Sequence, residues 1–151
     1  ALTIGNEVRT IAVFSFSFED LPLYYFCEIV EGTGKLSSLE TVLRLHGLFR
    51  HRLHPLRLSP LQASMLLYLD RHPHCEVSEI ASAFCIPKVS AIETVQHLQR
   101  NSWILKPRIN ANRKSVKLQL TAHGISLAQK VKANIGIIDK LLALAKTRNA
   151  A

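Results

Sequence analysis

Motifs of the common enzyme classes are missing from this sequence of 151 residues. It contains no Gly-x-Ser-x-Gly of the serine hydrolases, no glycine-rich phosphate loop and no His-Glu-x-x-His of the zinc peptidases. Its six glycines are scattered, and paired carboxylates are missing from its basic half. The sequence therefore predicts a binding protein, with no enzymatic activity, no cofactor and no metal.

Long apolar runs are absent as well. No run approaches the roughly 18 to 20 residues that a membrane span needs, and the first residues lack the pattern of a signal peptide. Three widely spaced cysteines, Cys27, Cys75 and Cys85, are an odd number and do not suggest a disulfide framework. We therefore expect a cytoplasmic protein with no membrane partner. The 48% hydrophobic content argues against disorder, and the length fits one domain.

Acidic residues become scarce along the chain, whose formal net charge is +8. Residues 1–40 hold two cations and six acids, whereas residues 41–151 hold 17 cations and five acids. From Thr94 onward, 11 cations stand against Asp139 alone. This distribution favours a nucleic acid partner, because neutralising phosphates releases condensed counterions. A solubilising basic surface is the plainer alternative.

Start signals and apolar spacing predict helices over residues 37–54, 60–71, 77–84 and 88–101. Ser37 or Ser38 can cap the first helix, and Ser59 followed by Pro60 can cap the second. In the fourth, Ala91, Val95 and Leu98 face inward. An apolar stripe is expected on the first, through Leu39, Val42, Leu43, Leu45, His46, Phe49 and Leu53.

A basic hairpin and a long helix follow. Residues 103–105 open a strand, and Val116, Leu118 and Leu120 alternate with Lys117 and Gln119 in its partner. Thr121 then caps a helix whose near-heptad spacing predicts a subunit interface through Ile125, Ala128, Val131, Ile135, Ile138 and Leu142. Near the N-terminus, period-two alternation predicts a strand or an extended arm that carries Phe14, Phe16 and Phe18.

Three segments, residues 53–62, 77–81 and 113–124, together resemble the MarR family of winged-helix transcriptional regulators. The third is the most specific, with two basic residues, an alternating strand and Thr-x-x-Gly. The resemblance spans roughly residues 36–145 and implies a mainly α fold with a small β-hairpin wing, a winged helix-turn-helix with long flanking dimerisation helices. We expect one domain, divided into an aromatic arm (1–35), a dimerisation helix (36–58), the DNA-binding region (59–121) and a C-terminal dimerisation helix (122–151).

The resemblance implies a dimeric transcriptional regulator, a ligand-responsive repressor that reads a pseudo-palindromic operator in double-stranded DNA. Residues 87–100 would be the recognition helix and residues 106–117 the basic wing. The homodimer would use the aromatic arm and the C-terminal seam, and the effector would be a small molecule. The expected DNA contacts are Pro87, Lys88, Val89, Ser90, Glu93, Arg108, Asn112, Arg113 and Lys114.

Three residues depart from the family pattern. Pro87 stands where a capping serine is usual, Glu93 where a basic or neutral residue is common, and Asn112 where an aspartate usually braces the wing. These departures leave two other functions open. One is a winged-helix module that binds another protein and has weak or non-specific DNA binding, and the other is a regulator that responds to oxidants through Cys27.

Two further features have a structural interpretation. His72, His74, Cys75 and Glu76 crowd one segment, which we interpret as a polar connecting loop, since adjacent residues rarely form one tetrahedral metal site. Cys85 lies in the turn of the helix-turn-helix and is expected to be buried.

Overall fold

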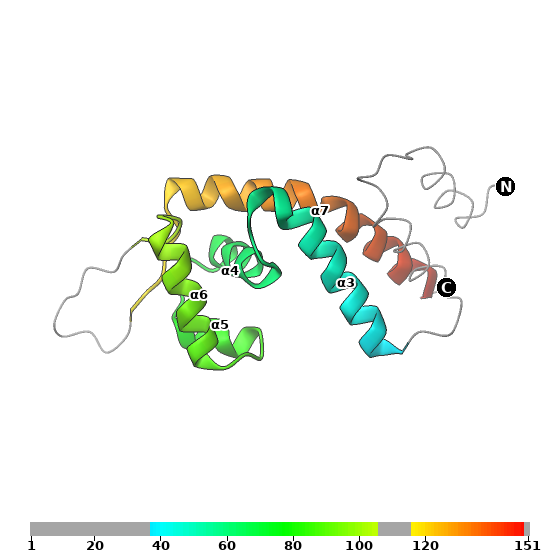
Figure 1. Ribbon diagram of the computed structural model, residues 1–151, viewed down its shortest axis with the longest axis horizontal. Helices are drawn as coiled ribbons and strands as arrows, with labels where there is room; N and C mark the ends of the chain where they lie inside the picture. The colour runs from blue at the N-terminus through cyan, green and yellow to red at the C-terminus, as the bar shows by residue number, and fades with distance from the viewer. Residues whose placement is uncertain (1–36, 106–115, 150–151) are drawn as a thin grey trace. The chain divides into compact units, whose positions relative to one another are not determined.

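The computed structural model describes residues 37–105 and 116–149 (Figure 1). The aromatic arm with Phe14, Phe16, Phe18 and Cys27 lies outside the described residues, as does the wing tip with Arg108, Asn112, Arg113 and Lys114. The described part is mainly α-helical, as predicted. Its elements are α3 (Ser38–Leu53), the 3-10 turn η1 (His54–Leu56), α4 (Pro60–Arg71), α5 (Val77–Ala83), α6 (Lys88–Arg100) and α7 (Ala122–Asn149). None of these helices is long and apolar enough to cross a membrane.

The chain divides into two compact units. The first contains α3 and the part of α7 from Ile135 onward, and the second spans Leu56–Asn134. The second unit holds the helix-turn-helix and the base of the predicted wing, and it therefore carries the candidate site.

Reciprocal capping boxes start α3 and α4. The Ser37 hydroxyl accepts from the Glu40 amide at 3.2 Å, and the Glu40 carboxylate accepts from the Ser37 amide at 2.7 Å. Ser59 and Gln62 repeat the arrangement, with Pro60 in the first turn. Each box satisfies amide groups that the start of a helix leaves without partners. The predicted caps at Ser37 and Ser59 are confirmed.

The first unit is built around Leu48 of α3 and Ile138 of α7. Leu45, Phe49, Ile137 and Leu142 pack against this pair. The stripe expected along α3 is buried only toward its end, because Leu39, Val42 and Leu43 in the first half are exposed.

The core of the second unit draws on all of its elements. Its largest fully buried side chains include Met65 and Leu66 of α4, Ile80 of α5, Leu98 of α6 and Ile104 beside the wing. The helices α5 and α6 lie side by side in Figure 1 and in direct contact. An ion pair joins α4 to α7, with Lys132 Nζ 2.7 Å from an oxygen of Asp70.

Three backbone segments are hydrogen-bonded together at the base of the predicted wing. Ile104 and Leu120 make an antiparallel bridge, and the Leu105 amide donates to the Gln119 carbonyl at 2.9 Å. The third segment is residues 74–75, whose backbone exchanges two hydrogen bonds of 2.9 Å with Leu118. The prediction of a polar loop is therefore wrong at Cys75, which is buried. Its small apolar side chain and its paired backbone suit a position in the core.

Candidate nucleic-acid interface

The turn between α5 and α6 is held by main-chain hydrogen bonds. The Cys85 amide donates to the Ser82 carbonyl at 3.2 Å, and the Ile86 amide donates to the Ala81 carbonyl at 3.0 Å. Cys85 has a φ angle of 52°, in the left-handed region that few side chains adopt. The expectation that Cys85 is buried is wrong, because the left-handed turn leaves its side chain exposed.

The recognition helix α6 has two distinct faces. Ala91, Val95 and Leu98 are buried, as the spacing predicts. At 100° per residue, the line opposite them passes through Val89, Glu93, Gln96 and Arg100, and all four are exposed. The helix therefore has a continuous exposed face along its whole length, opposite its buried face.

Two of the predicted contact residues at the start of α6, Val89 and Glu93, lie on this surface. Lys88 and Glu93 are exposed, Val89 is 65% exposed, and Ser90 is half-buried. Pro87 precedes the helix and is exposed, but its side chain makes no capping hydrogen bond. Ile92, Gln96 and Arg100 share the exposed side and were missing from the sequence prediction. They follow Val89 by three, seven and eleven residues, and this helical spacing is the signal that would have identified them.

A side-chain link fixes the C-terminal half of α6 against the start of α4. Gln62, whose oxygen closes the capping box of α4, places its amide nitrogen 3.2 Å from Nδ1 of His97. The imidazole also lies against Trp103, with ring centroids 6.4 Å apart. Residues at the base of the wing and on α4 thereby orient the recognition helix.

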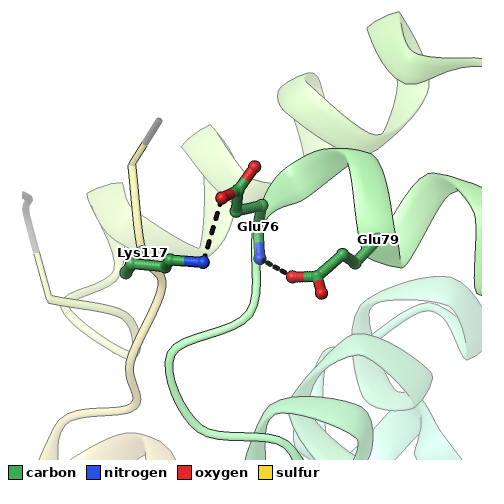
Figure 2. A network of polar contacts seen from close by, with 3 residues as sticks. All are labelled: Glu76, Glu79 and Lys117. Carbon is green, nitrogen blue, oxygen red and sulfur yellow. Dashed lines mark hydrogen bonds and ion pairs between the residues drawn. The ribbon is translucent and has the colours of Figure 1, made fainter. Parts of the chain in front are cut away.

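The exit of the wing is anchored by charge (Figure 2). Lys117 Nζ lies 2.9 Å from Oε1 of Glu76, and the Glu76 amide donates to the carboxylate of Glu79. The hydrogen bond to Glu76 raises the pKa of Lys117. One cation of the predicted wing is thus paired with the start of α5, and its charge is partly neutralised before any phosphate approaches.

The predicted seam on α7 divides by burial. Ala128, Val131 and Ile138 have no exposed surface in the single chain, whereas Ile125 is exposed and Ile135 and Leu142 are half-buried. Contacts within the chain thus account for the spacing of the three buried residues. The role of the seam in dimerisation stays a prediction, and Ile125, Ile135 and Leu142 are the members with surface available for it.

Cysteine and metal chemistry have little support in the described residues. Burial raises the pKa of the Cys75 thiol, which opposes formation of the reactive thiolate. Across residues 37–105 and 116–149, no group of three or more His, Cys, Asp and Glu side chains could hold a metal ion.

Comparison with known proteins gives a consistent assignment. Residues 58–116 match the family model described as the MarR family. No curated protein sequence matches the chain. The solved structure of the transcriptional repressor CouR bound to a 23-mer DNA duplex is 28% identical, with a TM-score of 0.65. The match covers 82% of this chain and 89% of that one.

Two further solved structures share the fold. A mutant of MarR from E. coli, complexed with operator DNA, is 14% identical, with a TM-score of 0.59 and coverage of 89% of this chain and 86% of that one. A MarR-family protein of Mycobacterium tuberculosis in complex with salicylic acid is 22% identical, with a TM-score of 0.54 and coverage of 72% and 85%.

Proposed function

We propose that the chain is a DNA-binding transcriptional regulator, because residues 58–116 match the MarR family model. The observation that carries this proposal is the geometry of α6. Its buried face is packed on α4 and α5, and its opposite face is exposed along the whole helix. Such a helix can enter the major groove, which is wide enough to admit it, while the wing contacts the backbone beside it.

The distribution of charge supports the same proposal. The wing segment 106–117 contains five of the chain's 19 cations and no acidic residue. The proposed wing tip carries Arg113 and Lys114, and the tip of a winged helix can reach phosphates or the minor groove. We propose that they fix the position of the protein and that α6 reads the bases.

Two further properties belong to the proposal. A homodimer would present two recognition helices to the two halves of a pseudo-palindrome, with half-sites about one helical turn apart. A small molecule would act as effector and modulate repression, as the salicylic acid complex of the M. tuberculosis relative suggests. We place this activity in the cytoplasm and assign the chain no enzymatic role.

A salt titration of DNA binding tests the proposal. The full chain is titrated with duplex DNA from roughly 50 to 200 mM salt, and the slope of log affinity against log salt is compared among variants. Lys114→Ala and Lys88→Ala should each weaken binding to every duplex and flatten the slope by about one unit. Lys130→Ala, which removes the same charge from α7, is the matched control and should preserve the slope. Failure of the unmodified chain to bind any duplex at low salt would refute the proposal.

A winged-helix module that binds another protein is the second candidate. The exposed Val89 and Ile92 at the start of α6 favour it, because apolar side chains add little to phosphate binding. In that case, the chain would bind all duplexes alike with a modest salt slope, and Val89→Ser would leave DNA affinity unchanged.

A further inference from the structure

The outermost line of α6 carries an acidic residue at its centre. Glu93 is exposed, and within the part of the chain that the structure describes its carboxylate has neither an ion pair nor a hydrogen bond. It lies one helical turn beyond Val89, directly opposite the buried Val95 and Leu98. A carboxylate that faces DNA is repelled by phosphates unless it receives a hydrogen bond there.

The major groove offers such a hydrogen bond at few positions. Guanine presents the acceptors N7 and O6, and thymine presents O4 and a methyl group, so both repel or ignore a carboxylate. Adenine has an N6 donor, but its N7 acceptor lies alongside and opposes the second oxygen. Cytosine presents its N4 amino group and is the base to which a glutamate pairs best.

Val89 is suited to contact a second base. Its residue surface is 65% exposed and its side chain ends in two methyl groups, which suit contact with the C5-methyl of thymine. Glu93 is four residue steps beyond Val89, a rise of about 6 Å along the helix. That rise is close to two base-pair steps of about 3.4 Å each.

We infer that Glu93 selects a cytosine in each half-site of the DNA, and that Val89 contacts a thymine within about two base pairs of it. This inference rests on the proposed function, because it assumes that α6 lies in the major groove. The inference gives Glu93, the acidic residue on an otherwise neutral or basic exposed face, the role of distinguishing among DNA bases. The affinity that Glu93 costs against phosphate is offset by the discrimination that it provides among bases.

Selection from a randomised duplex pool tests the assignment. The full chain, Glu93→Gln and Asp139→Asn are each used to enrich duplexes at one salt concentration, and the enriched pools are sequenced. The unmodified chain should enrich cytosine at one position per half-site. Glu93→Gln should replace it with adenine, whose N6 and N7 a glutamine pairs bidentately, with a change in the cytosine-to-adenine ratio of about tenfold or more.

Asp139→Asn removes the same charge from an exposed site on α7 and should leave the enriched sequence unchanged. Circular dichroism and thermal melting of Glu93→Gln confirm that it folds, since the side chain is exposed and the two residues have the same size. Identical enriched sequences from Glu93→Gln and the unmodified chain would overturn the assignment and leave the regulator function intact. No enriched sequence from the unmodified chain, or no binding at low salt, would instead overturn the proposed function and the assignment with it.

Deoxyuridine separates the contribution of Val89. Replacing the selected thymine by deoxyuridine deletes only the C5-methyl group, and it should weaken binding by the unmodified chain by roughly threefold or more. The Val89→Ala variant should bind both duplexes with nearly equal affinity. Equal affinity of the unmodified chain for both duplexes would overturn the thymine contact.

Discussion

The carbonyl oxygen of Trp103 lies 2.1 Å from the point that a Cβ atom on Gly124 would occupy. The same carbonyl accepts a hydrogen bond from the Thr121 amide at 3.0 Å, and the Thr121 hydroxyl accepts one from the Gly124 amide at 3.0 Å. The backbone beside the wing and the first turn of α7 therefore approach more closely than any residue with a side chain permits. This close contact explains the Thr-x-x-Gly motif in the sequence, because it requires glycine at position 124.

Gly124→Ala should be destabilising for this reason. The added methyl group overlaps a backbone atom, which cannot rotate away, so the start of α7 or residue 103 must shift. We expect the free energy of unfolding to fall by about 1–3 kcal/mol, as for other overpacked sites. Chemical denaturation monitored by circular dichroism measures it.

Gly136→Ala in the same helix is the matched control. Nothing lies within 4 Å of a Cβ atom added there, so the substitution gains helix propensity without a clash. Its free energy of unfolding should rise by about 0.5–1 kcal/mol. Equal effects of the two substitutions would contradict the close contact at Trp103.

The capping box of α3 predicts a pH dependence. The amide and hydroxyl of Ser37 hold the pKa of the Glu40 carboxyl below its usual range. A depressed carboxyl pKa means that the stabilisation is complete above the unfolded pKa of about 4.3 and is lost as pH falls through the folded value. The first turn of α3 should therefore fray in acid, visible as lower protection factors, corrected for intrinsic exchange rates, at the amides of Ser37, Glu40 and Thr41.

Serine substitutions isolate the cause. Ser37→Ala should move the NMR titration midpoint of Glu40 upward, toward the value of a free glutamate, because it removes the hydroxyl that supports the carboxylate. Ser38→Ala, at the neighbouring position, should leave the midpoint in place. If the titration midpoint of Glu40 is unchanged in the Ser37→Ala variant, the Ser37 hydroxyl does not lower this pKa.

Local signals explain how much of this fold the sequence could predict. The caps at Ser37, Ser59 and Thr121 and the inward face of α6 depend on residues within one or two turns of each other, and the structure confirms all of them. The pairing of residues 74–75 with Leu118 depends on partners more than 40 positions apart. No local sequence pattern predicts this pairing, and the polar neighbours of Cys75 instead suggest an exposed loop.

The site shows the same division. Sequence placed Lys88, Val89 and Glu93 at the start of the recognition helix, and the structure leaves all three exposed. It could not show that the chain itself covers Ala128, Val131 and Ile138, because a heptad-like spacing is the same whether the partner is intramolecular or a second subunit. Only the burial of each side chain in the folded chain distinguishes an intramolecular partner from a second subunit.

The ion pair between Glu76 and Lys117 should stabilise the fold through an energetic coupling of the two side chains. This contribution should weaken in high salt and disappear at high pH. Hydrogen bonding to Glu76 raises the pKa of Lys117, so its contribution is complete below the unfolded lysine value of about 10.4 and disappears as pH rises through the folded value. A double-mutant cycle of Glu76→Gln and Lys117→Met should show coupling at pH 7 in low salt. Additive effects of the two substitutions at pH 7 would refute the pair, and coupling that survives 1 M salt would refute its electrostatic origin.

The turn of the helix-turn-helix should respond to backbone preference at Cys85. Its φ of 52° costs an ordinary residue about 1–2 kcal/mol, and a β-branched residue more, because Cβ crowds the following carbonyl. We therefore expect Cys85→Asn to hold or raise the free energy of unfolding, and Cys85→Val to lower it by more than 1 kcal/mol. Ser82→Val, also exposed but at a helical position, should cost only about 0.5 kcal/mol or less. A Cys85→Val protein as stable as Ser82→Val would show that residue 85 can leave the left-handed region without cost.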